Sequence, residues 1–196
     1  MTAVGMWDRW MRSSVERAVR MQPKRVRKVA DEYLYAAPGA REEIEEIRAA
    51  CRRLVETGLT SSSLGRVAIR RTAHAVTQVA PGTDLNAVDA RHLETADRSG
   101  ADPVVEAAAA CGAAALAHPS SLMALAAAGR TPERTLKALA DQAGPIEIVD
   151  GPDPGTEGVW VVPSLGAIAV AGDIGGAVTR LEAAERLAQI TLAGKE

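Results

Sequence analysis

The sequence contains no phenylalanine, and aromatic residues make up only 3% of its 196 positions. Apolar residues nevertheless account for 47% of the chain, which is enough for a sizeable core in one domain. We therefore expect alanine, valine and leucine to fill the interior, where small side chains let helices and strands approach closely.

Cysteine is also scarce. Cys51 and Cys111 are the two cysteines, and two such residues make neither a disulfide framework nor a zinc motif. Both lie in alanine-rich, apolar stretches, so we expect small buried thiols. Free thiols in turn favour a reducing, cytoplasmic location.

Long apolar runs and an excess of one charge are absent. No stretch approaches the ~20 apolar residues that span a bilayer, and charged residues interrupt the start of the chain. We therefore expect no membrane span and no signal peptide. The net charge of -2 and the pI near 6.0 argue against a chain that binds nucleic acid over its whole surface.

The most informative stretch that is present runs from Gly112 to Leu125. An apolar run of strand length ends at His118, and Pro119, Ser120 and a helix-like run follow. A strand that ends in this way puts the imidazole at its carboxyl end. Open α/β sheets usually build their sites at that edge.

The first 36 residues differ from the rest. Their apolar residues recur about once per helical turn, and a basic cluster follows at residues 24–28. We predict a helical extension over residues 1–36 and a domain over 37–196, divided by a turn at residues 37–39. We interpret the extension as an amphipathic arm that packs on its own domain or on a neighbouring subunit. The alternatives are a basic handle for nucleic acid or an anionic membrane surface, and partial disorder.

The domain alternates helix-like and strand-like segments, which predicts an α/β fold with three αβα layers. The strand pairs at residues 67–79 and 159–170 are joined too tightly for parallel crossovers, so the central sheet must be largely antiparallel or mixed. We also predict a loop over Asp97–Pro103. A helix is predicted to begin at Thr131–Glu133, where a capping residue precedes a proline.

The order of short motifs resembles the class II aldolase/adducin family from about Arg41 to the C-terminus. The family has a Gly-Leu-Thr helix end, a Gly-Asn-x-Ser-x-Arg element, a Thr-Pro-x-Gly turn, a His-x-His-Ser-Pro strand end, a His-Gly pair and a last helix with Glu-x-x-Ala. The corresponding segments here are, in order, Thr57–Thr60, Gly65–Arg70, Ala80–Leu85, Leu116–Ser120, Leu165–Gly166 and Leu181–Leu192. The resemblance implies a class II aldolase-like fold.

In this family three histidines bind a divalent metal, usually zinc, which stabilises an enediolate. This chain has Leu116 and Leu165 at the first and third ligand positions and keeps only His118. One imidazole cannot hold zinc with useful affinity. We therefore predict no metal and assign no catalytic residue. His118 is a hydrogen-bonded relic, a lining residue of a small-molecule pocket, or a metal ligand completed by a neighbouring subunit or substrate.

The substrate groups implied by the resemblance have also changed. Arg66 stands at the family's asparagine position, and its guanidinium would suit a phosphate or carboxylate. We favour instead a surface ion pair of Arg66 with one of many local acids, and a turn-forming role for the serines before it. No carboxylate is assigned the family's general acid/base role; those nearby are Glu94, Asp97, Asp102 and Glu106. The candidate substrate-binding residues are His118, Arg66, Ser61, Ser62, Ser63 and Ser120.

Two hypotheses follow from these changes. The first is a pseudoenzyme, a binding or assembly module without metal-dependent lyase activity. The second is an aldehyde-lyase or related sugar-phosphate enzyme with an altered site, and only this hypothesis implies zinc or another divalent metal. The resemblance also implies a homo-oligomer, for which a tetramer is the form common in the family. The expected ligand is small and phosphorylated or carboxylated, and nucleic acid is not an expected partner.

Overall fold

A computed structural model describes residues 40–73, 75–97, 102–150 and 156–194 of the chain. The predicted extension over residues 1–36 and His74 lie outside these ranges. The chain divides into two units, Met1–Glu45 and Glu46–Glu196. The sheet and the candidate site belong to the second unit.

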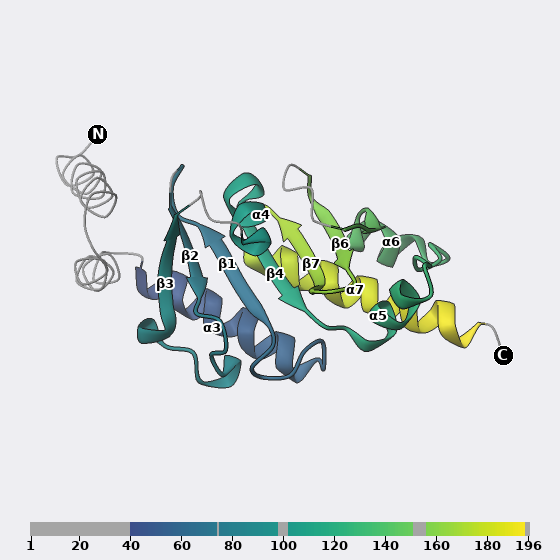
Figure 1. Ribbon diagram of the computed structural model, residues 1–196, viewed down its shortest axis with the longest axis horizontal. Coiled ribbons are helices and arrows are strands. Elements are labelled where there is room, and N and C mark those ends of the chain that lie inside the picture. Colours follow the sequence, from purple (N-terminus) through teal and green to yellow (C-terminus); the bar gives the residue numbers. More distant parts are fainter. Residues whose placement is uncertain (1–39, 74, 98–101, 151–155, 195–196) are drawn as a thin grey trace. The chain divides into compact units, whose positions relative to one another are not determined.

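The second unit is built on a sheet of seven strands in the order β3-β2-β1-β4-β7-β6-β5 (Figure 1). All neighbouring strands are antiparallel except β5 and β6, which are parallel. The predicted mixed, largely antiparallel sheet is therefore confirmed. The strands are β1 (Arg66–Arg70), β2 (Ala75–Val79), β3 (Leu93–Asp97), β4 (Ala113–Ala117), β5 (Ile146–Ile148), β6 (Gly158–Val162) and β7 (Gly166–Ala171).

Helices cover both faces of the sheet. Every residue of β4, β6 and β7 is buried, which requires cover on both sides. Helix α4 packs on one face in a cluster with alternate residues of β1, β4 and β7, and α7 packs against the same central strands from the other side (Figure 1). The helices are α3 (Ala40–Glu56), α4 (Pro103–Cys111), α5 (Ser120–Ala127), α6 (Lys137–Ala143) and α7 (Ile174–Ala193).

Local sequence explains where two of these helices begin. The side chain of Asp102 accepts a hydrogen bond from the backbone N–H of Val104, and Pro103 occupies the first turn of α4. The side chain of Asp173 accepts a hydrogen bond from the backbone N–H of Gly176 at 2.7 Å and so caps the last helix, α7. Helix α3 is tied to α7 by Arg53, which pairs with Glu182 at 2.5 Å.

The prediction of a helix beginning at Thr131–Glu133 is wrong, because α6 begins at Lys137. The preceding segment bonds to other elements instead. The backbone N–H of Glu133 donates to the Thr191 hydroxyl on α7 at 2.8 Å, and the Arg134 guanidinium donates to two carbonyls at the end of α6. Tertiary contacts therefore override the local helix-start signal.

The predicted loop over Asp97–Pro103 is wrong at both ends, because Asp97 is the last residue of β3 and Pro103 is the first residue of α4. Residues 98–101 between them lie outside the described ranges. The segment before β3 forms two 3-10 helices, η1 (Leu85–Ala87) and η2 (Ala90–His92). The thiol prediction holds for Cys51, which is buried, whereas Cys111 is only half-buried. Among the described residues, no helix is long and apolar enough to cross a membrane.

Candidate functional site

His118 follows the last residue of β4 directly, at the edge of the sheet where the sequence places it. Its backbone N–H donates to the carbonyl of Leu59 at 2.9 Å, and its Nδ1 lies 3.5 Å from the hydroxyl oxygen of Thr60. Thr60 is buried and His118 is half-buried. The loop that follows α3 thus holds both the main chain and the ring of His118.

The turn between β6 and β7 approaches His118 from another side. We call the place where Thr60, Leu116, His118 and Gly166 meet the His118 corner, or simply the corner. Gly166 has φ +132°, a conformation that L side chains rarely adopt. A Cβ at Gly166 would lie 2.7 Å from the carbonyl oxygen of Ala117, 3.0 Å from Leu116 Cδ1 and 3.1 Å from His118 Nε2. The main chain of Gly166 therefore approaches both side chains closely, and only glycine leaves them room.

The two leucines at the implied ligand positions lie in apolar surroundings. Leu116 is 3% exposed and belongs to the cluster beneath α4, and Leu165 packs against that cluster. Within the described ranges, no group of three His, Cys, Asp or Glu side chains is placed to hold a metal ion. The described side chains of this corner, one imidazole and two leucines, do not fit a zinc ion, which takes three protein donors in catalytic sites.

Arg66 lies opposite Leu116 in the pairing of β1 with β4. Its side chain is only 16% exposed and forms an ion pair of 2.5 Å with Asp102, the residue that caps α4. The same guanidinium donates to the side-chain oxygen of Gln78, whose amide group donates to Glu94 at 2.8 Å. A chain of four polar side chains therefore runs from the N-terminus of α4 across β1 and β2 to β3.

This arrangement bears on the ion-pair interpretation of Arg66 and leaves its binding role untested. The predicted ion pair with a local acid is present, and its acid is Asp102, but the pair is largely buried rather than at the surface. The sequence offered Asp102 and Glu94 only as nearby carboxylates and gave no indication of Gln78. One donor is left over, because the buried Nε of Arg66 has no hydrogen-bond partner among the described residues.

The serines lie on two different segments. The carbonyl of Ser61 accepts from the backbone N–H of Leu64, which closes a turn, and the carbonyl of Ser62 accepts from the N–H of Leu85 at the start of η1. This agrees with the turn-forming role that the sequence favours for Ser61, Ser62 and Ser63. Ser120 lies at the start of α5, where its hydroxyl oxygen is 3.5 Å from a carboxylate oxygen of Glu185. The structure brings His118, Thr60, Leu116 and Gly166 together, while Arg66 and Ser120 have acidic partners.

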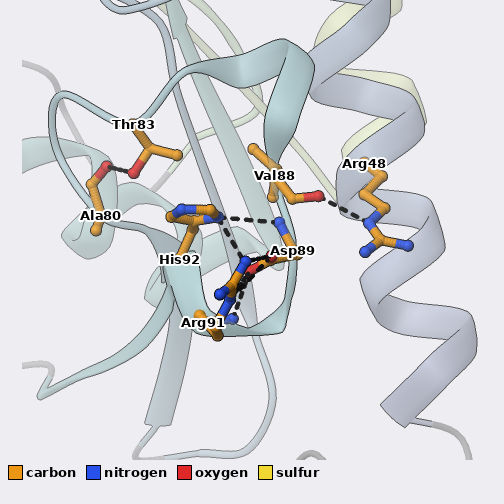
Figure 2. Close-up of polar contacts among 7 residues, drawn as sticks. All are labelled: Arg48, Ala80, Thr83, Val88, Asp89, Arg91 and His92. Carbon is orange, nitrogen blue, oxygen red and sulfur yellow. Dashed lines mark hydrogen bonds and ion pairs between the residues drawn. The ribbon is translucent and has the colours of Figure 1, made fainter.

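His92 lies at the end of η2 and bonds to Asp89 at the start of the same segment. The backbone N–H of Asp89 donates to Nδ1 of His92 at 3.2 Å, a contact that can be followed in Figure 2. Arg91 forms an ion pair with Asp89 at 2.7 Å, and this bond lowers the pKa of the Asp89 carboxyl to about 2. The neighbouring Arg48 of α3 donates from Nε to the carbonyl of Val88 at 2.8 Å (Figure 2). The Arg48 bond ties the η1–η2 segment to α3, and the other contacts hold the segment to itself.

Two surface hollows lie away from His118. One of about 270 Å³ is lined by α3 and the η1 segment, including Arg52 and Leu85. The other, of about 320 Å³, is lined by α3 and the first turns of α7, including Arg53 and Ile174. Neither hollow is lined by Arg66 or by the serines.

The sequence matches no protein-family model and no curated protein. Solved structures, by contrast, superpose over most of the chain. The L-fuculose-1-phosphate aldolase of Thermus thermophilus has a TM-score of 0.67 at 17% identity, over 78% of this chain and 95% of its own. This chain has the class II aldolase fold. YgbL of Klebsiella pneumoniae, a putative aldolase/epimerase/decarboxylase, has a TM-score of 0.61 at 15% identity, over 80% of this chain and 91% of its own.

An aldolase II superfamily protein of Pseudomonas syringae gives a similar result, with a TM-score of 0.62 at 16% identity over 81% of this chain and 76% of its own. The class II aldolase-like architecture implied by the motif order is therefore confirmed. Identities this low establish the fold and leave the chemistry to the residues of the site.

Proposed function

We propose that this chain is a class II aldolase-like pseudoenzyme, a binding or assembly module without metal-dependent lyase activity. The observation that carries the proposal is the apolar setting of the two implied ligand positions. Leu116 lies in the cluster beneath α4 and Leu165 packs against it, and Leu116 Cδ1 and His118 Nε2 both lie close to the Cβ position of Gly166. Lewis-acid catalysis of this kind needs several neutral or anionic donors around one open position. Leucine offers no donor at either implied ligand position, and Leu116 adds apolar volume close to the imidazole.

The retained polar groups support a binding role. We propose a small phosphorylated or carboxylated ligand as the partner of this corner, contacted by the following residues: His118, Arg66, Ser61, Ser62, Ser63 and Ser120. Among the described residues the buried Nε of Arg66 has no hydrogen-bond partner, which leaves one donor of the type that suits an oxygen of such a ligand. Because Asp102 already pairs with the guanidinium of Arg66, the ligand must share that guanidinium with the Asp102 carboxylate. We therefore expect weak binding.

The second candidate is an aldehyde-lyase or related sugar-phosphate enzyme with an altered site, which would work with zinc or another divalent metal. Its support is the place of His118 at the end of β4, where the Thr60 hydroxyl meets the ring. The L-fuculose-1-phosphate aldolases among the similar structures make a sugar phosphate the natural substrate to test.

We also propose a cytoplasmic homo-oligomer, with a tetramer as the form that the resemblance favours. Both cysteines are free thiols, which suits a reducing compartment. The apolar face of the sequence over residues 1–36 is suited to a subunit interface. Light scattering on the full chain and on a chain lacking residues 1–36 tests this point. A monomer in both samples would refute it.

The experiment for the main proposal assays aldol cleavage of L-fuculose 1-phosphate by the purified full chain, with and without added Zn²⁺. We expect no product above the rate without protein in either condition. The matched variant is His118→Ala. Turnover that the wild type shows and this variant loses would overturn the proposal in favour of the second candidate.

A further inference from the structure

Helix α5 begins two residues after His118, and its first turn lacks a cap from its own sequence. Pro119 occupies the N-cap position and has no side-chain group to accept a hydrogen bond. The first backbone N–H groups of a helix have no partner inside it, so they need an acceptor from elsewhere. In this chain the acceptor comes from α7.

Glu185 of α7 supplies that acceptor. One carboxylate oxygen accepts from the backbone N–H of Ser121 at 3.0 Å, and the other accepts from Leu122 at 2.9 Å. The Ser120 hydroxyl and the Gln189 amide group lie 3.5 and 3.3 Å from the first oxygen. Both oxygens of the carboxylate are therefore bonded to the start of α5, across 63 residues of sequence or more.

The burial of Glu185 shows that this contact is not a surface pair. Only 7% of the residue is exposed. Within the described part of the chain, no Lys, Arg or His forms an ion pair with it. A buried carboxylate without a cation is costly unless strong donors surround it. The two backbone N–H groups and the positive end of the helix dipole provide that compensation.

The consequence for the site follows from the position of the anchors. On one side, the backbone of His118 bonds to Leu59. On the other side, two residues further along the chain, the start of α5 bonds to Glu185. The turn that carries the imidazole is thus held between the loop after α3 and helix α7.

We propose that Glu185 is a positioning residue for His118: by binding the N–H groups of Ser121 and Leu122, it fixes the turn from which the imidazole meets Thr60 and Gly166. This goes beyond the proposed function, because it assigns the orientation of the site to a residue on another element. It holds whether the corner binds a ligand or carries out a reaction.

The test compares Glu185→Gln with wild type by NMR of the full chain, with the imidazole signals of His118 assigned through His118→Asn. The amide keeps the size of the carboxylate but places an NH₂ group against one backbone donor. We expect the His118 signals to shift or broaden. We also expect the amide hydrogens of Ser121 and Leu122 to exchange about tenfold faster or more.

The matched control is Glu182→Gln on the same helix, which removes a charge that pairs with Arg53 rather than with α5. Glu182→Gln should leave the His118 signals and the amide exchange rates of Ser121 and Leu122 unchanged. Glu185→Asp serves as the second variant, since it keeps the charge but is one methylene shorter, and it should move the His118 signals in the same sense. Unchanged His118 signals in both Glu185 variants would overturn the proposal, even if exchange at α5 became faster.

Discussion

The guanidinium group of Arg66 lies 2.5 Å from a carboxylate oxygen of Asp102, so that strand β1 is tied to the first turn of helix α4. Asp102 has two roles in this contact, because the same carboxylate caps the helix through the N–H of Val104. The Asp102 carboxylate also pairs with the guanidinium of Arg66, which would otherwise suit an anionic ligand.

The first prediction concerns this double role. Asp102→Ala should lower the free energy of unfolding by about 1–3 kcal/mol, because it removes a helix cap and a partly buried ion pair. Asp173→Ala is the control, since it removes the cap of α7, for which the described residues show no ion pair, and should cost about 1 kcal/mol. Urea unfolding gives both values. A double-mutant cycle with Arg66→Ala that shows no coupling above ~0.5 kcal/mol would contradict the ion pair.

Central strands could be predicted from the sequence because burial on both faces leaves an uninterrupted apolar signal. Strand β4 is such a run, and its apolar residues predicted correctly that His118 follows the end of a strand. Strand β3 was missed for the opposite reason. Its residues Leu93–Asp97 lie at the edge of the sheet, where one side has no neighbour and polar side chains are tolerated.

The contacts that build the site could be predicted less well than the strands. The motif order points to Thr60, Arg66 and His118, but the residues that they contact depend on strand register and helix packing. Gln78 reaches Arg66 because β1 and β2 pair side by side, and Glu185 reaches α5 from 63 residues away. No local pattern encodes such pairs, since each is fixed only when the sheet and its helices assemble.

The second prediction tests the close approach of the β6–β7 turn to His118. Gly166→Ala should destabilise the chain by about 2 kcal/mol or more, because the added Cβ meets both a strained backbone and the Ala117 carbonyl. Gly82→Ala is the matched variant. Gly82 also has a positive φ, but nothing lies within 4 Å of its Cβ position, so the cost should be about 1 kcal/mol. Equal losses of thermal stability in the two variants would show that Gly166 does not approach Ala117 and His118 closely.

The third prediction concerns stability at alkaline pH. Burial raises the pKa of the Cys51 thiol from its ordinary value of 9.0 to about 12. The unfolded chain therefore loses this proton at a lower pH than the folded chain, so the free energy of unfolding must fall as pH rises between these values. This residue should contribute a slope of up to about 1.4 kcal/mol per pH unit.

Cys51→Ala removes the titrating group and gives the comparison. Urea unfolding between about pH 8 and the alkaline limit should show a shallower decline for the variant than for wild type, whatever the variant costs at neutral pH. Native-state alkylation read by peptide mass spectrometry provides an independent check, and Cys51 should stay unmodified. Parallel pH profiles together with rapid labelling of Cys51 would be incompatible with a buried thiol.

The most direct measurement of the central claim is a calorimetric titration of the full chain with Zn²⁺, in wild type, in His118→Ala and in the double variant Leu116→His with Leu165→His. We predict no stoichiometric binding by wild type and no effect of removing His118. The double variant should gain a site for about one ion per chain, because three imidazoles then surround the corner. A single tight site in wild type that disappears in His118→Ala would contradict the account.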